Sequence, residues 1–305
     1  MSNSIFSFII ISYNRAEDTI DAIKNVLQLD EVQGWEKEIV VLNNGSTSDY
    51  SVLQNFIDDL SETDKQKIQY INHTENLGVA GGRNLCIQKS NGKYLLFLDD
   101  DAEIANKDVI AKVLHLYEKF QAQKLAIIGF LGQNPFTKKW DMPLKNPRLI
   151  EGKTEVFYNL FFGYGHVFPK SLIAETGYYQ EDFFYGMEEY DLSYATVKAG
   201  YSILFTKEIL AIHKQNPNGR EPSDTTQARF FENKMIVVYK HLPMQYVVSH
   251  FIFWSAYFLY KTKGSIVLYF KTVKSMFRRF KQAKRVVIDE RGMQYLHDVQ
   301  ARLWY

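Results

Sequence analysis

The sequence predicts an α/β protein in which a mostly parallel sheet is flanked by helices and followed by a helical C-terminal extension. Short apolar runs rich in β-branched residues alternate with segments of helical periodicity over residues 6–98, a pattern typical of parallel sheets with helices on both faces. Hydrophobic residues make up 46% of the 305 residues, which is enough for a large core and excludes a disordered chain. Beyond residue 223 the pattern is helical to the end.

The expected strands are short apolar runs, several of which end at polar clusters: 6–12, 38–42, 68–72, 93–98 and 210–213. The expected helices between them are 19–29, 52–60, 84–89 and 192–198, with another near 107–109. Three prolines between residues 130 and 166 indicate irregular connections, and the polar segment 214–223 predicts a mobile loop. In such sheets ligands bind at the carboxyl ends of the strands, so the polar clusters there are candidate site residues.

Composition limits the classes of function. A formal net charge of +1 gives no overall field that would attract nucleic acid. The chain has one cysteine, Cys86, which excludes an internal disulfide and a cysteine-cluster metal site and suits a reducing compartment. The N-terminus lacks the basic region of a signal peptide, and the apolar stretch 246–260 is shorter than the ~20 residues of a spanning helix. We therefore expect a cytoplasmic protein.

Three adjacent carboxylates, Asp99, Asp100 and Asp101, follow one of the expected strands. Hard oxygen ligands at a strand end are what Mg²⁺ or Mn²⁺ prefers, and these ions complete their coordination with water and substrate phosphates. The alternative is a solvated acidic turn before a helix. The triplet by itself is compatible with both.

A second acidic cluster, with Glu188, Glu189 and Asp191, follows the aromatic segment 183–185. A carboxylate beside aromatic side chains is partly desolvated, which raises its pKa toward that of a useful general base. The alternative is a helix N-terminus that is rich in acids because they interact favourably with the helix dipole.

Two further segments are candidates. His213 ends an apolar strand and enters a polar loop, where its imidazole could bind a metal that Asp101 also holds. The glycine-rich segment 76–84, which contains Arg83, precedes an expected helix and could present backbone N–H groups to a phosphate. It matches neither the dinucleotide fingerprint nor the P-loop.

In their order along the chain, these segments resemble the inverting family 2 glycosyltransferases with a GT-A fold, of the bacterial surface-glycan type that includes rhamnosyl- and galactosyltransferases. The matching segments are 7–15, 39–49, 76–84, 94–101, 177–192 and His213. Each is short, and it is their common order that makes the resemblance specific.

The resemblance implies a role for each candidate. The residues that it places at the nucleotide-sugar donor are Tyr13, Asn14, Arg15, Asn43, Asn44, Arg83, Asp99 and Asp100. It implies that Asp99, Asp101 and His213 hold Mn²⁺ or Mg²⁺ against the donor diphosphate. Glu189 would be the general base, and Asp191 would orient Glu189 or the acceptor.

The sequence departs from the family pattern at three places. Asn43 stands where many relatives carry Asp, which weakens any inference about the nucleotide base. The pair Glu188-Glu189 leaves two candidates for the general base. Near the C-terminus, relatives often have Arg-Asn where this chain has Glu232-Asn233, so Arg229 is a candidate substitute.

Residues 261–285 carry nine lysines and arginines and no acid, interleaved with aromatic and aliphatic residues. A basic amphipathic helix after an aromatic stretch indicates contact with an anionic membrane surface. The alternative is a helical appendage that packs on the catalytic domain or forms a homodimer.

We therefore expect a catalytic domain over residues 1–240 and a basic helical tail over 241–305. The expected function is metal-dependent transfer of a sugar from a UDP- or dTDP-sugar to a hydroxyl of a lipid-linked or cell-surface polysaccharide, at the inner face of a bacterial membrane. The alternatives are a membrane-docked scaffold that binds nucleotide sugars without catalysis, and another nucleotide-dependent α/β enzyme such as a nucleotidyltransferase.

Overall fold

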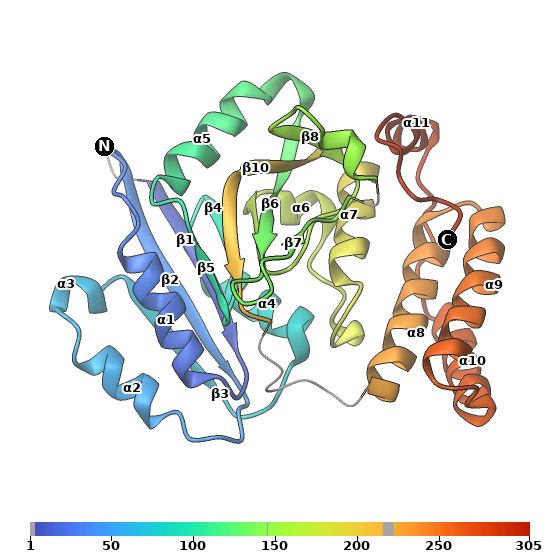
Figure 1. Ribbon diagram of the computed structural model, residues 1–305, viewed down its shortest axis with the longest axis horizontal. Coiled ribbons are helices and arrows are strands. Elements are labelled where there is room, and N and C mark those ends of the chain that lie inside the picture. The colour runs from blue at the N-terminus through green and yellow to red at the C-terminus, as the bar shows by residue number, and fades with distance from the viewer. Residues whose placement is uncertain (1–3, 145, 216–222) are drawn as a thin grey trace.

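A computed structural model describes residues 4–144, 146–215 and 223–305 (Figure 1). Most of the segment 214–223, predicted as a mobile loop, lies outside the described residues. The described part of the chain forms a ten-stranded mixed sheet with helices on both faces and a group of helices at one side (Figure 1). The predicted α/β class is confirmed.

Eight strands follow one another across the sheet in the order β3-β2-β1-β4-β9-β6-β10-β5, with β7 paired to β6 and β8 to β10. The strands are β1 (Ser4–Ser12), β2 (Trp35–Asn44), β3 (Ile68–His73), β4 (Tyr94–Asp99), β5 (Ala102–Ile104), β6 (Leu125–Gln133), β7 (Trp140–Asp141), β8 (Glu155–Tyr158), β9 (Gly165–Pro169) and β10 (Ser202–His213). The β1–β4 half is parallel, whereas β9 runs antiparallel between β4 and β6. As a result β1, β2, β4 and β10 all end at the same edge.

The helices are α1 (Ala16–Leu27), α2 (Ser51–Asp58), α3 (Glu62–Lys65), α4 (Gly78–Lys89), α5 (Val109–Lys119), α6 (Leu172–Thr176), α7 (Glu188–Lys198), α8 (Ser223–His241), α9 (Met244–Lys261), α10 (Ile266–Phe280) and α11 (Glu290–Asp298). Alternate residues of β1 face opposite sides of the sheet. Phe8 and Ile10 pack with α1, α2 and α5, while Ile9 packs with α4, α6 and α7. Both faces are covered, which explains the continuous apolar run of β1.

Two parts of the chain differ from expectation. Residues 130–166, predicted as irregular connections, contain β7 and β8 and also include the end of β6 and the start of β9. Helix α4 begins at Gly78 rather than at residue 84, even though glycine disfavours helix. A Cβ on Gly82 would lie 3.2 Å from Ile11 and 3.3 Å from Leu42, so the glycines allow α4 to pack closely on the sheet.

The C-terminal helices pack against the rest of the described chain. Helices α8, α9 and α10 lie side by side next to α7 (Figure 1), and their buried side chains belong to the same core cluster as Ile9 of β1. The boundary expected at residue 240 falls at the end of α8, which packs with the tail. Two of the nine basic residues expected to face a membrane make internal bonds instead: Arg279 binds Asn233 and Asp182, and Arg285 binds backbone carbonyls.

Candidate active site

A cavity of about 590 Å³ opens at the sheet edge where β1, β4 and β10 end. Its lining includes most of the residues proposed from the sequence: Tyr13, Asn14, Arg15, Asn44, Arg83, Asp99, Asp100, Asp101 and His213. These come from segments that are far apart in the sequence. They meet because the strand register places Asp99 beside Ile11 and His213 beside Ala102.

Asp99, Asp101 and His213 form a cluster whose candidate ligand atoms all lie within 4.8 Å of one another. Asp99 ends β4, Asp101 directly precedes β5, and the pairing of β5 with β10 brings His213 across from that turn. The Nε2 atom of His213 lies 3.4 Å from Asp101 Oδ1 and 3.9 Å from Asp99 Oδ2. Burial opposes protonation of His213, but hydrogen bonding to Asp101 and the charges of both carboxylates raise its pKa.

The donor set of this cluster fits a divalent cation. Two carboxylates and one imidazole are ligands that Mn²⁺ accepts, and Mg²⁺ is also bound through carboxylates. The cluster lies in the cavity wall, so substrate oxygens and water could complete the coordination.

Asp100 has a different position from its two neighbours. Its Oδ1 lies 2.6 Å from Arg15 Nη1, and its Oδ2 accepts a hydrogen bond from the backbone N–H of Tyr13. Burial raises the pKa of Asp100 to about 7 although the charge of Arg15 lowers it. Asp100 therefore ties the end of β4 to the end of β1 and fixes the turn that carries the metal-ligand candidates.

Arg83 connects the second acidic cluster to the first. Its guanidinium, contributed by α4, is almost fully buried and donates a 2.8 Å hydrogen bond from Nη1 to Glu189 Oε1. Nη1 also lies 3.6 Å from Glu188, and Nη2 lies 3.8 Å from Asp99. A single cation thus holds carboxylates from β4 and from the first turn of α7.

The two glutamates of α7 differ in exposure. The side chain of Glu188 is 3% exposed and that of Glu189 is 17% exposed. Burial, together with the charge of Glu189, raises the pKa of Glu188 to about 8. A Cβ on Gly163, which lines the cavity, would lie 2.5 Å from Glu189 Oε1, so Glu189 is next to the cavity wall. Glu189 is the more accessible of the two.

The turn before α7 is held by contacts that the sequence did not predict. Phe184 and Met187 both have positive φ angles, of 59° and 75°. The side-chain amide of Asn233 in α8 donates hydrogen bonds to the carbonyls of Phe183, Tyr185 and Gly186. This clamp fixes the entry into α7 and therefore the position of Glu189.

Three of the predicted site residues lie outside the cavity lining: Asn43, Glu189, which lies behind Gly163, and Asp191. Asn43 donates to Asn72 and accepts from the backbone of Ser46, so it stabilises a loop. Asp191, predicted as catalytic, accepts hydrogen bonds from Lys240 and from His241 at 2.8 Å or less. Asp191 therefore joins α7 to α8, and its expected role of orienting Glu189 or the acceptor stays a prediction.

Other residues of the cavity were missed. Val79, Gly163, Phe184 and Tyr185 all line it. From the sequence, side chains around residues 161–166 and 181–187 were expected to shape the acceptor and sugar pockets, without a role for any one of them. Arg229 stacks on the Phe184 ring, with 4.6 Å between Cζ and the ring centroid, which places the candidate substitute for the family arginine beside the cavity.

Comparison with known proteins decides the family. Residues 7–170, more than half of the chain, match the model of glycosyl transferase family 2. The chain belongs to glycosyl transferase family 2. A glycosyltransferase of Rickettsia bellii is 47% identical over 96 residues, 31% of this chain and 12% of that protein. The putative colanic acid biosynthesis glycosyl transferase WcaA of Escherichia coli is 32% identical over 102 residues, 33% of this chain and 34% of WcaA.

The fold of this family 2 chain also matches solved structures. GalNAc-T7, crystallised with UDP, GalNAc and Mn²⁺, superposes with a TM-score of 0.65 at 15% identity, over 99% of this chain and 58% of GalNAc-T7. This likeness confirms the expected GT-A type of fold. In each of these three comparisons the match spans less than two thirds of the other protein.

Proposed function

We propose that the protein is a metal-dependent, inverting glycosyltransferase that uses a nucleoside diphosphate sugar. The observation that carries this proposal is one cavity with a three-residue cation site in its wall and the Arg83–Glu189 pair beside it. A nucleotidyltransferase would not need a general base there, and a non-catalytic scaffold would need neither cluster.

Asp99, Asp101 and His213 would hold Mn²⁺ or Mg²⁺. When bound, the ion supplies positive charge that offsets the charge developing on the departing diphosphate. Tyr13, Asn14 and Arg15 form the wall at the end of β1 against which the nucleotide lies. Asn14 is itself fixed in place, because its Oδ1 accepts hydrogen bonds from the backbone of residues 47 and 48.

Glu189 acts as the general base. It accepts the proton of the acceptor hydroxyl while the hydroxyl oxygen forms a bond to the anomeric carbon of the sugar. The bond from that carbon to the phosphate oxygen breaks, and the nucleoside diphosphate leaves with the bonding electrons. Attack from the face opposite the leaving group inverts the configuration.

UDP or dTDP is the proposed nucleotide. The fold relative GalNAc-T7 was crystallised with UDP and Mn²⁺, which supports this choice. Calorimetric titration with UDP and with dTDP, with and without Mn²⁺, tests it. We expect one of the two to bind at micromolar concentration and only with metal; absence of binding by either with metal present would refute the proposed donor.

The proposed acceptor is a lipid-linked or cell-surface polysaccharide, and the proposed location is the cytoplasmic surface of the membrane. Partial similarity to WcaA supports the surface-glycan assignment. Among the residues that the structure describes, no helix is both long and apolar enough to cross a bilayer. A surface on α9 and α10, which we call the apolar face, supports peripheral contact instead.

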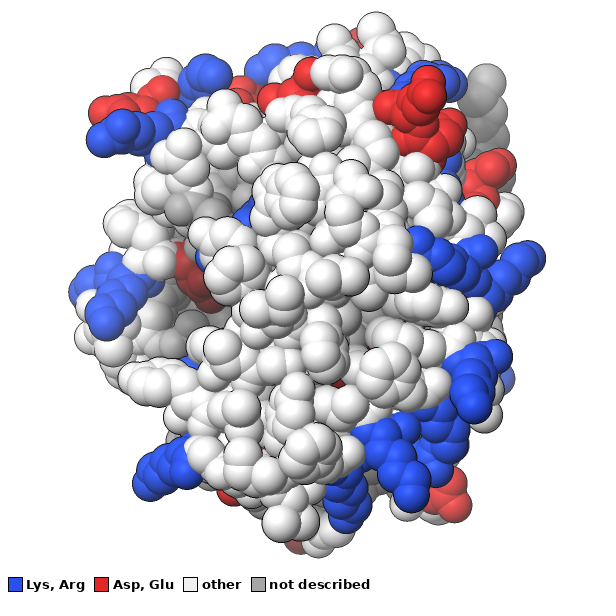
Figure 2. Space-filling model, turned by 90° about the vertical axis from the view of Figure 1, so that its right-hand side faces the viewer, with Lys and Arg blue, Asp and Glu red and all other residues white. Residues whose placement is uncertain are grey.

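The apolar face consists of exposed large hydrophobic side chains, including Val248, Ile252, Phe253, Tyr257, Ile266, Val267 and Phe270. Figure 2 shows it: uncharged residues occupy the middle, and lysines and arginines lie mainly along the margins. Exposed lysines of the tail at positions 261, 263, 271, 274 and 281 provide positive charge there. An apolar surface with a basic margin complements an anionic bilayer rather than a second copy of itself.

Reversing two of these charges is expected to weaken membrane binding. The double variant Lys271→Glu, Lys274→Glu should bind vesicles containing phosphatidylglycerol at least about tenfold less tightly, since each lysine near an anionic surface contributes about 1 kcal/mol. Vesicle sedimentation measures this. The control, Lys24→Glu with Lys107→Glu, has the same change in charge, and Lys24 lies on α1, across the sheet from the apolar face (Figure 1). Equal loss in both, or dimerisation through α9 and α10, would contradict membrane contact.

A further inference from the structure

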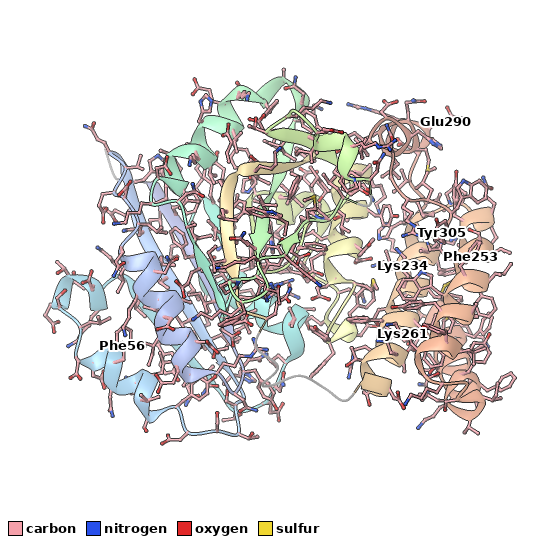
Figure 3. All side chains as sticks on the ribbon, in the orientation of Figure 1. Phe56, Lys234, Phe253, Lys261, Glu290 and Tyr305 are labelled. Carbon is pink, nitrogen blue, oxygen red and sulfur yellow. The ribbon has the colours of Figure 1, made fainter. Side chains whose placement is uncertain are left out.

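A second cavity, of about 460 Å³, lies between the start of α7 and the C-terminal helices. We call it the α9 cavity. Half of its lining comes from residues 234–305, beyond the part of the chain that matches the family model: Lys234, Phe253, Trp254, Tyr257, Arg302 and Tyr305. Figure 3 shows Lys234 between α7 and α8, with Phe253 and Tyr305 farther out on the same side. The C-terminal part of the chain therefore supplies half of the lining of this cavity.

The α9 cavity adjoins the proposed active site. Met187 and Tyr190, on either side of the Glu188-Glu189 pair, line it. Residues 159 and 160 also line it, while Gly163 on the same segment lines the first cavity and contacts Glu189. The start of α7 and residues 159–163 therefore lie between the two cavities, and Glu189 itself lines neither of them.

The chemistry of the lining is aromatic and cationic. Six of the lining residues have aromatic rings, and none of the lining side chains described is a carboxylate. Lys234 Nζ lies 3.9 Å from the centroid of Tyr190, and Arg302 Cζ lies 3.7 Å from that of Tyr305. Lys234 and Arg302 thus bring two positive charges to the lining of one cavity. Such a site favours an anion.

A mostly buried amide side chain also belongs to the lining of this cavity. Asn159 is 4% exposed, and its Oδ1 has no hydrogen-bond partner among the residues that the structure describes. A buried acceptor without a partner costs free energy unless a ligand or water donates to it. For a sugar ligand, the aromatic side chains of the lining provide flat apolar surfaces for the C–H face of the ring.

The outer rim of the α9 cavity is part of the apolar face. Phe253 and Tyr257 line the cavity and are still 53% and 45% exposed. A ligand that leaves the cavity on this side therefore passes onto exposed apolar surface.

We propose that the α9 cavity binds the acceptor as a lipid-linked sugar phosphate. The phosphate lies between Lys234 and Arg302, and the hydrocarbon chain runs out over Phe253 and Tyr257. The sugar then extends past Tyr190 toward the proposed base. This inference rests on the proposed transferase function and adds the place and the chemical class of its acceptor.

Binding of farnesyl phosphate, followed by tryptophan fluorescence, tests the inference in the full-length protein, with farnesol and inorganic phosphate as the other two ligands. We expect farnesyl phosphate to bind at least about tenfold more tightly than either, because only it has both the charge and the chain. Arg302→Gln should reduce its affinity to about that of farnesol. Equal affinity for farnesyl phosphate and farnesol, or no binding, would overturn the proposal.

Two tyrosines of α9 provide a test that distinguishes binding in the α9 cavity from binding on the rest of the apolar face. Tyr257 lines the cavity, whereas Tyr260, three residues on and 79% exposed, is outside its lining. Tyr257→Ala should weaken farnesyl phosphate binding about tenfold and Tyr260→Ala by less than about twofold, since aromatic contacts contribute roughly 1 kcal/mol. Equal loss in both variants would mean that the lipid binds the open face, and would overturn the proposal.

Titrating the same variants with the nucleotide distinguishes a failure of the acceptor-site proposal from a failure of the proposed transferase function. All three variants should bind the nucleotide with Mn²⁺ as the unchanged protein does. Metal-dependent nucleotide binding without selective farnesyl phosphate binding would overturn the acceptor site alone. Selective farnesyl phosphate binding without nucleotide binding would overturn the transferase function and leave a lipid-phosphate site.

Discussion

Asp101→Asn is expected to reduce metal-dependent nucleotide binding at least about 100-fold, because a ligand to a divalent cation contributes several kcal/mol of charge stabilisation. Asp101 is almost completely buried, and its Oδ1 faces His213 while Oδ2 lies 3.5 Å from Arg15. Asparagine keeps the shape of the side chain and removes its negative charge. Calorimetric titration of nucleotide at fixed Mn²⁺ measures the loss.

Glu103→Gln is the matched control for this change. Glu103 lies on β5, two residues from Asp101, and its carboxylate faces Lys214 at 3.2 Å. The same loss of one charge there should change nucleotide affinity by less than about threefold, as expected of a partly exposed ion pair. If Asp101→Asn binds nucleotide and metal like the unchanged protein, the cation site is elsewhere.

Glu189→Gln is expected to lower the rate of sugar transfer about 1,000-fold while leaving nucleotide affinity within about threefold. General base catalysis contributes 10²–10⁴-fold, and glutamine cannot accept the proton. The glutamine oxygen can still accept the hydrogen bond from Arg83, so the wall of the cavity should keep its shape. Single-turnover transfer and nucleotide titration on the same preparation separate catalysis from binding.

Glu188→Gln is the matched control, because it changes the neighbouring residue of the same turn. Glu188 is less accessible than Glu189 to an acceptor hydroxyl, with 3% against 17% of the side chain exposed, so we expect its replacement to cost less than about tenfold in rate. A large loss of transfer in Glu188→Gln, with nearly normal transfer in Glu189→Gln, would assign the base to Glu188.

The sequence was sufficient to predict which strand ends meet. Asp99 and His213 each end an apolar run, and the carboxyl ends of parallel strands lie at one edge of a sheet. For Asp101, His213 and Arg83, local pattern and family order pointed to residues that the structure brings together around one cavity. These residues lie close together because the topology of the fold brings the segments that carry them to one edge of the sheet.

Other features depend on contacts that no local pattern encodes. Asp191 has the sequence context of a catalytic acid, but its position one turn along α7 directs it to Lys240 and His241 of α8. Asn233 clamps the turn before α7 only because α8 packs there. The α9 cavity depends on the same packing. Pairing between helices is set by side-chain shapes that are distributed along the whole chain, so periodicity alone could not predict it.

The cation cluster also has a consequence for how the chain keeps its folded form. Asp101 and His213 are separated by more than a hundred residues and meet only when β5 has paired with β10. The unfolded chain contains no preformed site, so an ion held there binds the folded state alone and shifts the folding equilibrium toward it. The chain between these two residues includes β6, β8, β9 and α7. An ion bound to both residues would therefore cross-link the two ends of a long loop. Metal supply would then govern the lifetime of the enzyme in the cell as well as its turnover.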